Sequence, residues 1–380
     1  MIGKNAQISA IFKKGNKSQA KNYRPVSLTS VICKTLERII RDHLIDHIDK
    51  NKLFSDKQYG FIKGRSTTLQ LLEVLDKWTE AIDDGLEVDC IYTDFMKAFD
   101  KVPHKKLIKP VENVGISDPI LGWIEGFLTG RYQCVSINEE ISEWKEVISG
   151  IPKGSVLRSI MFVLYINDLP SSVDSVAYLF ADDTKIFRII NNFPETLQDD
   201  LKQLETSENW LLKFNPEKCK HIHMQRKKEP NAQIYKLLGH EIERVSEEKD
   251  IEVTIDEELT FEKHVQEKSK KANSTFAAIR RSFKYLKVDT ILPLYKSMVR
   301  SHLVYANSVW APYKKGIIDQ IESVQKRATK QIPALRNLSY KERLQKLKLP
   351  TLAYRRIRGD LIEAYKIVHM TQMSAMYYSS

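Results

Sequence analysis

The sequence has no cysteine pairs, no long apolar run and no low-complexity tract, and each absence excludes a class of protein. The four cysteines are scattered and form no CxxC motif: Cys33, Cys90, Cys134 and Cys219. They are expected to be reduced thiols of an intracellular protein rather than a disulfide framework. The longest apolar run, Ile160–Ile166, is far too short to span a bilayer, and residues 1–14 lack the apolar stretch of a signal peptide. The sequence therefore predicts no membrane association.

The composition favours a folded protein with a polyanionic partner. Hydrophobic residues make up 42% of the 380 residues, which is enough for real cores, and this length predicts two or three subdomains. Lysine and arginine number 60 against 49 acidic residues, giving a net charge of +11. Because cationic side chains displace counterions from phosphates, this excess suits nucleic acid, although it is also compatible with a merely basic soluble protein.

An Asp-Asp pair carries the strongest chemical signal. Phe180-Ala181-Asp182-Asp183 connects two β-favouring runs, Val176–Phe180 and Thr184–Ile190. Adjacent carboxylates in a tight turn repel each other unless a cation offsets the repulsion. Mg²⁺ prefers oxygen ligands and leaves coordination positions open for substrate phosphates. Taken alone, however, an Ala-Asp-Asp sequence is more often a solvated turn than a metal site.

A further carboxylate strengthens the metal interpretation. Asp94 ends another β-favouring run, Val88–Tyr92, although an N-cap of the following helix is the alternative. Three carboxylates from two neighbouring strand ends can hold two metal ions, which activate a hydroxyl and stabilise a leaving pyrophosphate. Phosphoryl transfer needs little covalent help from the protein, so positioned ions can supply most of the catalysis.

Three segments, in this order, resemble the catalytic motifs of reverse transcriptases from jockey-type, LINE-like non-LTR retrotransposons. They are Asp94–His104, then Ser149–Leu157 followed by Tyr165–Pro170, and then Phe180–Asp183. Asn22–Leu28 and Gln58–Phe61 are similar to the finger motifs of that family. The likeness extends from about Phe12 to beyond Lys366, and chance assembly of all these motifs in one order is negligible.

The resemblance implies an α/β (α+β) right-hand polymerase with an antiparallel palm sheet. Residues 1–225 would form the fingers and palm, residues 226–265 the β connection with the primer grip, and residues 266–380 an α-helical thumb and post-thumb region. The implied activity is RNA-directed DNA polymerisation, in which a primer 3′-hydroxyl is extended with dNTPs. It uses two Mg²⁺ ions, for which Mn²⁺ can substitute. The implied partners are an RNA template and a DNA primer or target, in the nucleus and cytoplasm. The oligomeric state stays open.

The resemblance also assigns roles to individual residues. Asp94, Asp182 and Asp183 would bind the metal ions. Lys218 would protonate the pyrophosphate as a general acid, unless it is an ordinary surface lysine. Phe99 would exclude ribonucleotides by crowding the sugar 2′ position, unless it is a core aromatic. The remaining nucleotide-binding candidates are three residues of a turn near the nascent base pair and three cations that could grip the triphosphate or form surface salt bridges: Pro152, Lys153, Gly154, Arg24, Lys34 and Arg65.

Several departures from the family pattern predict impaired activity. Lys153 replaces a usual Gln, Arg158-Ser159 replace Gly-Pro, and Glu252 replaces a Gly. A charge at Arg158 is expensive in a buried helix unless it is paired. These departures, and a chain that begins at the fingers without an upstream endonuclease, fit a decayed or truncated copy. The alternative function is therefore a catalytically inactive nucleic-acid-binding remnant. A metal-dependent phosphohydrolase is a further alternative, but it leaves Phe99 and Gly154 without a role.

One competing metal site lies downstream. Cys219, His221 and His223 alternate along a predicted strand, so their side chains are expected on one face. Zinc binds such ligands, but no fourth ligand is evident in the sequence.

Overall fold

The computed structural model describes residues 4–96, 98–190, 195–206, 213–225, 233–283, 285 and 287–378. Lys97, within the first resembling motif, lies outside the described residues. The chain divides into two compact units, and each is described by itself. The first consists of Met1–Ser66, Leu86–His223 and Lys227–Arg244, and the second of Thr67–Gly85, Met224–Arg226 and Val245–Ser380.

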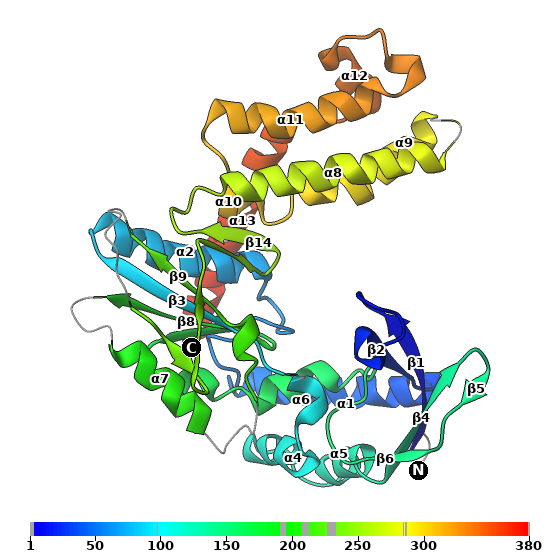
Figure 1. The fold of residues 1–380 in the computed structure, drawn as a ribbon, viewed down its shortest axis with the longest axis vertical. Helices are drawn as coiled ribbons and strands as arrows, with labels where there is room; N and C mark the ends of the chain where they lie inside the picture. Colours follow the sequence, from blue (N-terminus) through cyan, green and yellow to red (C-terminus); the bar gives the residue numbers. More distant parts are fainter. Residues whose placement is uncertain are drawn as a thin grey trace. The chain divides into compact units, whose positions relative to one another are not determined.

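The described part of the first unit combines helices with two five-stranded sheets and the small β10–β11 sheet (Figure 1). Its helices are α1 (Val31–Lys50), α3 (Ala98–Lys101), α4 (His104–Asn113), α5 (Ile120–Leu128), α6 (Arg158–Tyr165) and α7 (Glu195–Thr206). Its strands are β1 (Asn5–Phe12), β2 (Tyr23–Leu28), β3 (Glu87–Thr93), β4 (Arg131–Ile137), β5 (Glu140–Ile141), β6 (Lys145–Val147), β7 (Val176–Phe180), β8 (Asp183–Ile190), β9 (Lys220–Met224), β10 (Lys236–Leu237), β11 (His240–Glu241) and β12 (Glu243–Arg244).

One five-stranded sheet, called the β3 sheet below, has the strand order β12-β9-β3-β8-β7. Strands β3 and β8 are antiparallel, with Thr93 opposite Thr184, and β7 and β8 form an antiparallel hairpin. These strands form because their sequences are rich in β-branched and aromatic residues, and because β3 and β7 are buried along most of their length. The three strand predictions around the aspartates are therefore confirmed, as is an antiparallel sheet.

The buried apolar residues of this unit form a core cluster. All six residues from Ile160 to Tyr165 of α6 are buried, so one helix is apolar on every side and lies inside the unit. The core cluster also includes buried residues of α1, α4, α5, α7 and β3. The helix that carries Arg158 at its first position is consequently fixed by packing.

The second sheet has the order β2-β1-β4-β5, and β6 also pairs with β4. Strands β1 and β4 are parallel, whereas β1 and β2 are antiparallel. The antiparallel pairing of β4 with β6 confirms the predicted strands at Tyr132–Ile137 and Trp144–Ile148.

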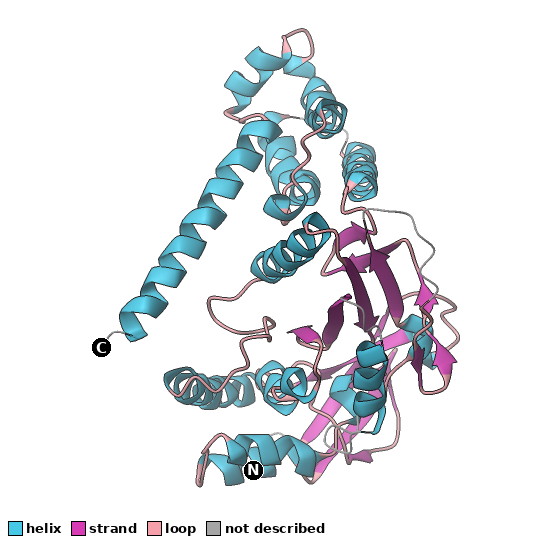
Figure 2. Cartoon of the chain, turned by 90° about the vertical axis from the view of Figure 1, so that its left-hand side faces the viewer, coloured by secondary structure: helices cyan, strands magenta, loops and turns pink. Residues whose placement is uncertain are grey.

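The second unit is mostly helical. It contains α2 (Thr67–Asp83), β13 (Glu247–Asp250), β14 (Val253–Asp256), α8 (Glu262–Ser282), α9 (Val288–Leu294), α10 (Asn307–Trp310), α11 (Lys315–Lys330), α12 (Tyr340–Leu347) and α13 (Leu352–Tyr378). In Figure 2, α13 is the long helix that ends at the mark for the C-terminus. Within the described part of the chain, no helix has the length and hydropathy needed to cross a membrane.

A buried polar cluster occupies the position of the considered zinc site. Asp89 of β3 accepts hydrogen bonds at one oxygen from His221 (2.8 Å) and His223 (2.7 Å), and at the other from the Tyr235 hydroxyl (2.5 Å). Cys219 instead directs its thiol to the carbonyl of Asn215. The zinc interpretation is therefore wrong in its ligand set, because the two histidines face a carboxylate that binds them directly.

The electrostatics of Asp89 favour a structural role. Burial alone raises the pKa of Asp89, but the hydrogen bonds from His221, His223 and Tyr235 outweigh burial and hold that pKa well below its ordinary value. The carboxylate thus remains charged, and each of its partners depends on it for a buried hydrogen bond.

We predict that Asp89→Ala lowers the free energy of unfolding by about 3–5 kcal/mol, because it leaves buried polar partners uncompensated. Asp46→Ala, at an exposed position of α1, should change it by no more than about 0.5 kcal/mol. Urea denaturation of both variants and the parent measures the difference. Equal stability of the two variants would show that the cluster does not hold the sheet.

Candidate active site

Strand pairing brings the three aspartates to one end of the central strands of the β3 sheet. Asp94 directly follows the last residue of β3, Asp182 lies in the two-residue turn between β7 and β8, and Asp183 is the first residue of β8. Thr93 lies opposite Thr184 in this antiparallel pair. The next residue after Thr93, Asp94, and the residue before Thr184, Asp183, therefore lie next to each other. The charge of Asp94 acts on Asp182 directly, raising its pKa. Residues about ninety positions apart in the sequence therefore share one site.

The turn that carries Asp182 is held from outside by the segment containing Gln58. The backbone N–H of Tyr59 donates to Leu179 O (2.8 Å), so this segment pairs with β7. The buried Gln58 side chain accepts at Oε1 from the amides of Gly60 (2.8 Å) and Ala181 (3.0 Å). Ala181 has φ 57°, a left-handed conformation that a non-glycine residue adopts at a cost. The Gln58 amide offsets that cost by fixing the turn.

Gly60 is required by the closeness of this contact. A Cβ at Gly60 would lie 2.3 Å from the backbone nitrogen of Ala181. Sequence reasoning included Gln58–Phe61 through the family resemblance alone and missed its role in bracing the aspartate turn. No local pattern could have revealed that role, because the partner lies more than a hundred residues away.

Burial and repulsion act together on Asp182. Burial raises the pKa of its carboxyl, and the nearby negative charge of Asp94 raises it further. Arg158 and Lys218 counteract both effects by favouring the charged form. The site is thus an acidic cluster whose charges need cations, and two of those cations come from the chain itself.

Lys218 reaches the cluster through a second pairing. The backbone of Lys213–Asn215 is hydrogen-bonded to that of Asp94–Met96, with Met96 N to Lys213 O at 2.7 Å and Asn215 N to Asp94 O at 2.8 Å. A short 3₁₀ turn, Pro216–Lys218, follows and directs the lysine back toward the strand end. Its Nζ donates to Asp94 Oδ2 at 2.9 Å. The predicted general acid therefore lies beside a predicted metal ligand.

Asp100 organises the residues around Phe99. Its two carboxylate oxygens accept from Lys153 Nζ (2.6 Å) and Arg158 Nη2 (3.0 Å). The Arg158 guanidinium also donates to the Ile151 carbonyl and lies 4.6 Å from the centre of the Phe99 ring. Burial lowers the pKa of Arg158, while Asp100 opposes that shift. The sequence predicts that a charge at Arg158 is expensive unless it is paired, and the structure pairs it with the Asp100 carboxylate and the Ile151 carbonyl.

Phe99 is fixed between two neighbours. Its ring stacks on Phe162 of α6 with centroids 4.0 Å apart, and Arg158 covers it on the cluster side. The ring is partly buried, so the structure is compatible both with a sugar-facing position and with the alternative core role.

The loop between β6 and α6 is tied to the β1–β2 hairpin. Ser27 N donates to Lys153 O at 2.8 Å, and Gly154 has φ 106° with space for a Cβ blocked by the Ser27 carbonyl at 2.8 Å. Only glycine satisfies both conditions without strain. The turn formed by Pro152, Lys153 and Gly154 is thus fixed beside the cluster. At Gly154 this turn contacts strand β2 and not an open surface.

The three cationic candidates lie apart in this unit. Arg24 is exposed on β2, and Lys34 is half-buried near the start of α1. Arg65 is engaged within its own loop: its Nη1 donates to the carbonyls of Ser55 and Gln58, and its Nη2 pairs with Asp56 at 3.4 Å. Arg65 therefore stabilises the loop that braces the aspartate turn.

The donor chemistry fits a hard divalent cation. Carboxylate oxygens are the ligands that Mg²⁺ prefers, and a cation would relieve the repulsion between Asp94 and Asp182. Considering only the residues that the structure describes, no three His, Cys, Asp or Glu side chains are gathered tightly enough, as they stand, to hold a metal ion. Lys218 occupies one oxygen of Asp94, so binding of a cation there requires this lysine to move.

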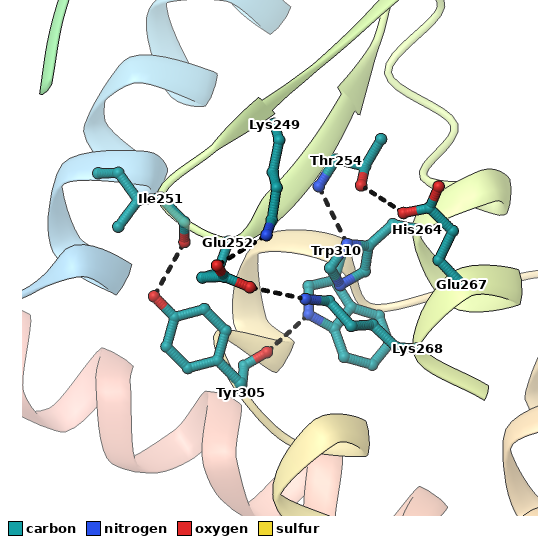
Figure 3. A network of polar contacts seen from close by, with 9 residues as sticks. All are labelled: Lys249, Ile251, Glu252, Thr254, His264, Glu267, Lys268, Tyr305 and Trp310. Carbon is teal, nitrogen blue, oxygen red and sulfur yellow. Dashed lines mark hydrogen bonds and ion pairs between the residues drawn. The ribbon is translucent and has the colours of Figure 1, made fainter. Parts of the chain in front are cut away.

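In the second unit, Glu252 lies at the tip of the β13–β14 hairpin with φ 69°, a conformation that favours glycine. Its carboxylate pairs with Lys249 (2.7 Å) and Lys268 (3.5 Å), as Figure 3 shows. The Tyr305 hydroxyl donates to the adjacent Ile251 carbonyl at 3.0 Å. A glutamate at position 252 therefore strains the backbone of the hairpin tip, which favours glycine. Its negative charge, however, is neutralised by two lysines, and the Tyr305 hydroxyl fixes the hairpin.

His264 completes this network (Figure 3). Burial lowers the pKa of His264 to about 4, so its ring is neutral near pH 7. The neutral Nδ1 accepts from the Thr254 amide at 3.0 Å, and Thr254 Oγ1 donates to Glu267 at 3.0 Å. Strand β14 is thereby fixed to helix α8.

Comparisons of the sequence agree with this geometry. A family model described as reverse transcriptase (RNA-dependent DNA polymerase) matches residues 11–242. The chain is 26% identical over 346 residues to the probable RNA-directed DNA polymerase from transposon BS of Drosophila melanogaster, covering 87% of this chain and 38% of that relative. It is also 26% identical over 347 residues to the RNA-directed DNA polymerase from mobile element jockey of the same fly, covering 87% and 37%. The chain therefore spans less than two fifths of these relatives.

Solved structures with a similar fold include two of telomerase from one yeast. Apo telomerase from Candida tropicalis matches with a TM-score of 0.53 and 12% identity, over 91% of this chain and 61% of that chain. Telomerase from the same yeast in complex with a fragment of telomeric RNA matches with a TM-score of 0.51 and 10% identity, over 94% and 58%. At these identities the similarity concerns the fold alone.

The contact at Gly60 generates a first prediction for the site. Gly60→Ala should destabilise the chain by about 1–3 kcal/mol, because the added methyl overlaps the backbone of the aspartate turn. Gly316→Ala in α11 is the matched control: no atom lies within 4 Å of its Cβ position, so helix propensity should make this change neutral or stabilising. Urea midpoints measure both, and a harmless Gly60→Ala would rule out the brace.

A double-mutant cycle tests the role of Asp100. Asp100→Ala should cost more stability than Asp100→Ala combined with Arg158→Ala, because the single change leaves a half-buried guanidinium without its carboxylate. We expect a coupling energy of about 1–3 kcal/mol, measured by urea denaturation. The exposed pair Asp199–Lys202 should give about 0.5 kcal/mol or less. Equal coupling in the two pairs would mean that Arg158 is not compensated by Asp100.

Proposed function

Because the chain belongs to the reverse transcriptase (RNA-dependent DNA polymerase) family and has the right-hand polymerase fold, we propose that it is the RNA-directed DNA polymerase of a jockey-type non-LTR retrotransposon. Its substrates would be dNTPs, a primer 3′-hydroxyl and an RNA template. The observation that carries the proposal is the assembly of Asp94 with Asp182 and Asp183 at one end of the central strands of the β3 sheet. That assembly supplies the carboxylates that nucleotidyl transfer needs.

In this proposal Asp94, Asp182 and Asp183 hold two Mg²⁺ ions, for which Mn²⁺ can substitute. When bound, such ions activate the primer hydroxyl and offset the negative charge that develops on the leaving pyrophosphate. The proposal is supported by the burial of Asp182 and by its repulsion from Asp94, which a divalent cation would relieve.

Lys218 would hold the proton that the leaving pyrophosphate takes up. Its ammonium lies 2.9 Å from Asp94 Oδ2, so it is already at the edge of the reacting centre and exposed enough to move. A lysine near a triphosphate also favours the negative charge of the product. Phe99, fixed by Phe162 and Arg158, would crowd the 2′ side of the incoming sugar.

The other candidates would bind substrate or nucleic acid. Pro152, Lys153 and Gly154 would form the floor under the nascent base pair, and Arg24 and Lys34 would contact the triphosphate. We propose that Arg65 acts on the same site, through the loop that it stabilises. We also assign the fingers and palm to residues 1–225, the β connection to 226–265, and the thumb and post-thumb region to 266–380. A retrotransposon enzyme of this kind would act in the nucleus and cytoplasm.

We predict that Asp182→Asn lowers primer extension by about a thousandfold, because loss of a metal-binding charge removes several kcal/mol of transition-state stabilisation. Asp199→Asn, at an exposed position of α7, should leave the rate unchanged. The assay is extension of oligo(dT) on poly(rA) with Mg²⁺ or Mn²⁺.

The activity of the unmodified protein in the same assay distinguishes the two candidate functions. Extension above the Asp182→Asn background supports the polymerase. A parent that binds the primer–template and is as inert as Asp182→Asn is the catalytically inactive remnant that the departures at Lys153, Arg158 and Glu252 suggest.

A further inference from the structure

A cavity of about 600 Å³ lies in the first unit. It lies between the β1–β2 hairpin, the start of α1, helix α5 and the first residue of β4, and its lining includes Leu36, Glu37, Trp123, Phe127 and Arg131. Its volume falls within the range of about 300–1,000 Å³ that is typical of small-ligand sites.

Two buried charges of opposite sign line this cavity without touching. Glu37 is fully buried and Arg131 is 4% exposed. Burial lowers the pKa of Arg131, and attraction to Glu37 opposes that shift. The two groups therefore interact electrostatically. Within the described part of the chain no ion pair joins them, and the Arg131 guanidinium lies 5.1 Å from the centre of the Phe127 ring. An acceptor and a set of donors thus face one space, and a group that fits between them would satisfy both.

Unsatisfied polar atoms support the same conclusion. Glu37 Oε1 and Thr29 Oγ1 are buried, belong to lining residues and find no hydrogen-bond partner among the described residues. Arg131 Nη1 donates a hydrogen bond to the Phe127 carbonyl at 3.2 Å. Buried polar groups in native proteins are nearly always paired, so unpaired ones around a cavity indicate a missing polar ligand rather than a purely apolar one.

The shape and charge of the walls define the ligand further. Trp123 and Phe127 both line the cavity and are stacked in parallel, with centroids 5.4 Å apart and planes 7° apart. Lys4 adds a second positive charge to the lining. The site therefore needs a flat ring with a hydrogen-bond donor next to an acceptor, attached to an anion.

We propose that this cavity binds a nucleobase, stacked on Trp123, with its donor edge on Glu37, an acceptor on Arg131 and its phosphate near Lys4. Stacking on aromatic rings and carboxylate acceptance from exocyclic amines are general modes of base binding. The base belongs either to a free nucleotide or to an unpaired nucleic-acid strand.

The site is connected to the aspartate region through Glu37 itself. Its second oxygen, Oε2, accepts from Ser155 Oγ (2.7 Å), Val156 N (2.6 Å) and Leu157 N (3.3 Å). These residues continue the turn formed by Pro152–Gly154 and lead into α6. A base held at Oε1 would share this carboxylate with the turn, so occupancy of the cavity and the position of the turn are linked.

The test is binding in the presence of EDTA, so that it does not depend on catalysis. Isothermal titration with the four nucleoside 5′-monophosphates, with ribose 5-phosphate as the control, measures capture of a free base. Fluorescence of 2-aminopurine within a ten-nucleotide single-stranded RNA measures stacking of a base that belongs to a strand. Binding of mononucleotides identifies the free nucleotide, and quenching in RNA alone identifies the strand; either result supports the base site.

Trp123→Ala should weaken that binding by about 5- to 150-fold, the range expected for loss of one base-stacking surface. Trp123→Phe should restore most of it, and Trp144→Ala, which removes an exposed tryptophan of the same unit outside the cavity, should have no effect. The proposal is overturned if no base binds, if Trp123→Ala binds as well as Trp144→Ala, or if ribose 5-phosphate binds equally well.

Discussion

The structure of the first unit depends on placing like charges together at one end of the β3 sheet. Pairing of β3 with β8 forces Asp94 toward Asp182 and Asp183, and the resulting repulsion must be offset. Lys218 and Arg158 supply positive charge, and Gln58 holds the strained turn at Ala181. Each compensating residue comes from a different part of the chain. The acidic site is therefore stable only because the surrounding fold delivers these partners, and the same repulsion makes it receptive to a divalent cation.

Asp100 connects that site to the turn beside it. One carboxylate binds both Lys153 and Arg158, two residues at which the sequence departs from the family pattern. The positive charges at Lys153 and Arg158 can therefore both be accommodated, because Asp100 is the counterion of each. Glu252 is neutralised in the same way by Lys249 and Lys268. Charge burial is consequently a weak argument for loss of function here, and the remaining argument is the altered shape of the turn.

Local patterns predicted the parts of the fold that local physics decides. The β-favouring runs before and after Asp182 became β7 and β8, and the run before Asp94 became β3. The partners of Asp89 and Asp100, and the contact of Gln58 with Ala181, could not be predicted, because these partners lie 53 to 146 residues away along the chain. The zinc alternative, which the missing fourth ligand already disfavoured, shows the same limit: alternation placed His221 and His223 together, but the sequence could not show that both bind Asp89.

The central claim is that the three aspartates form a metal-dependent centre. An anomalous difference map of crystals grown with Mn²⁺, a primer–template and a non-hydrolysable dNTP tests it most directly. The account predicts two peaks about 3.5–4 Å apart in contact with Asp94 and Asp182, with Lys218 displaced from Asp94. A map with dNTP bound but no peak at these carboxylates, and with Lys218 still paired to Asp94, would contradict it.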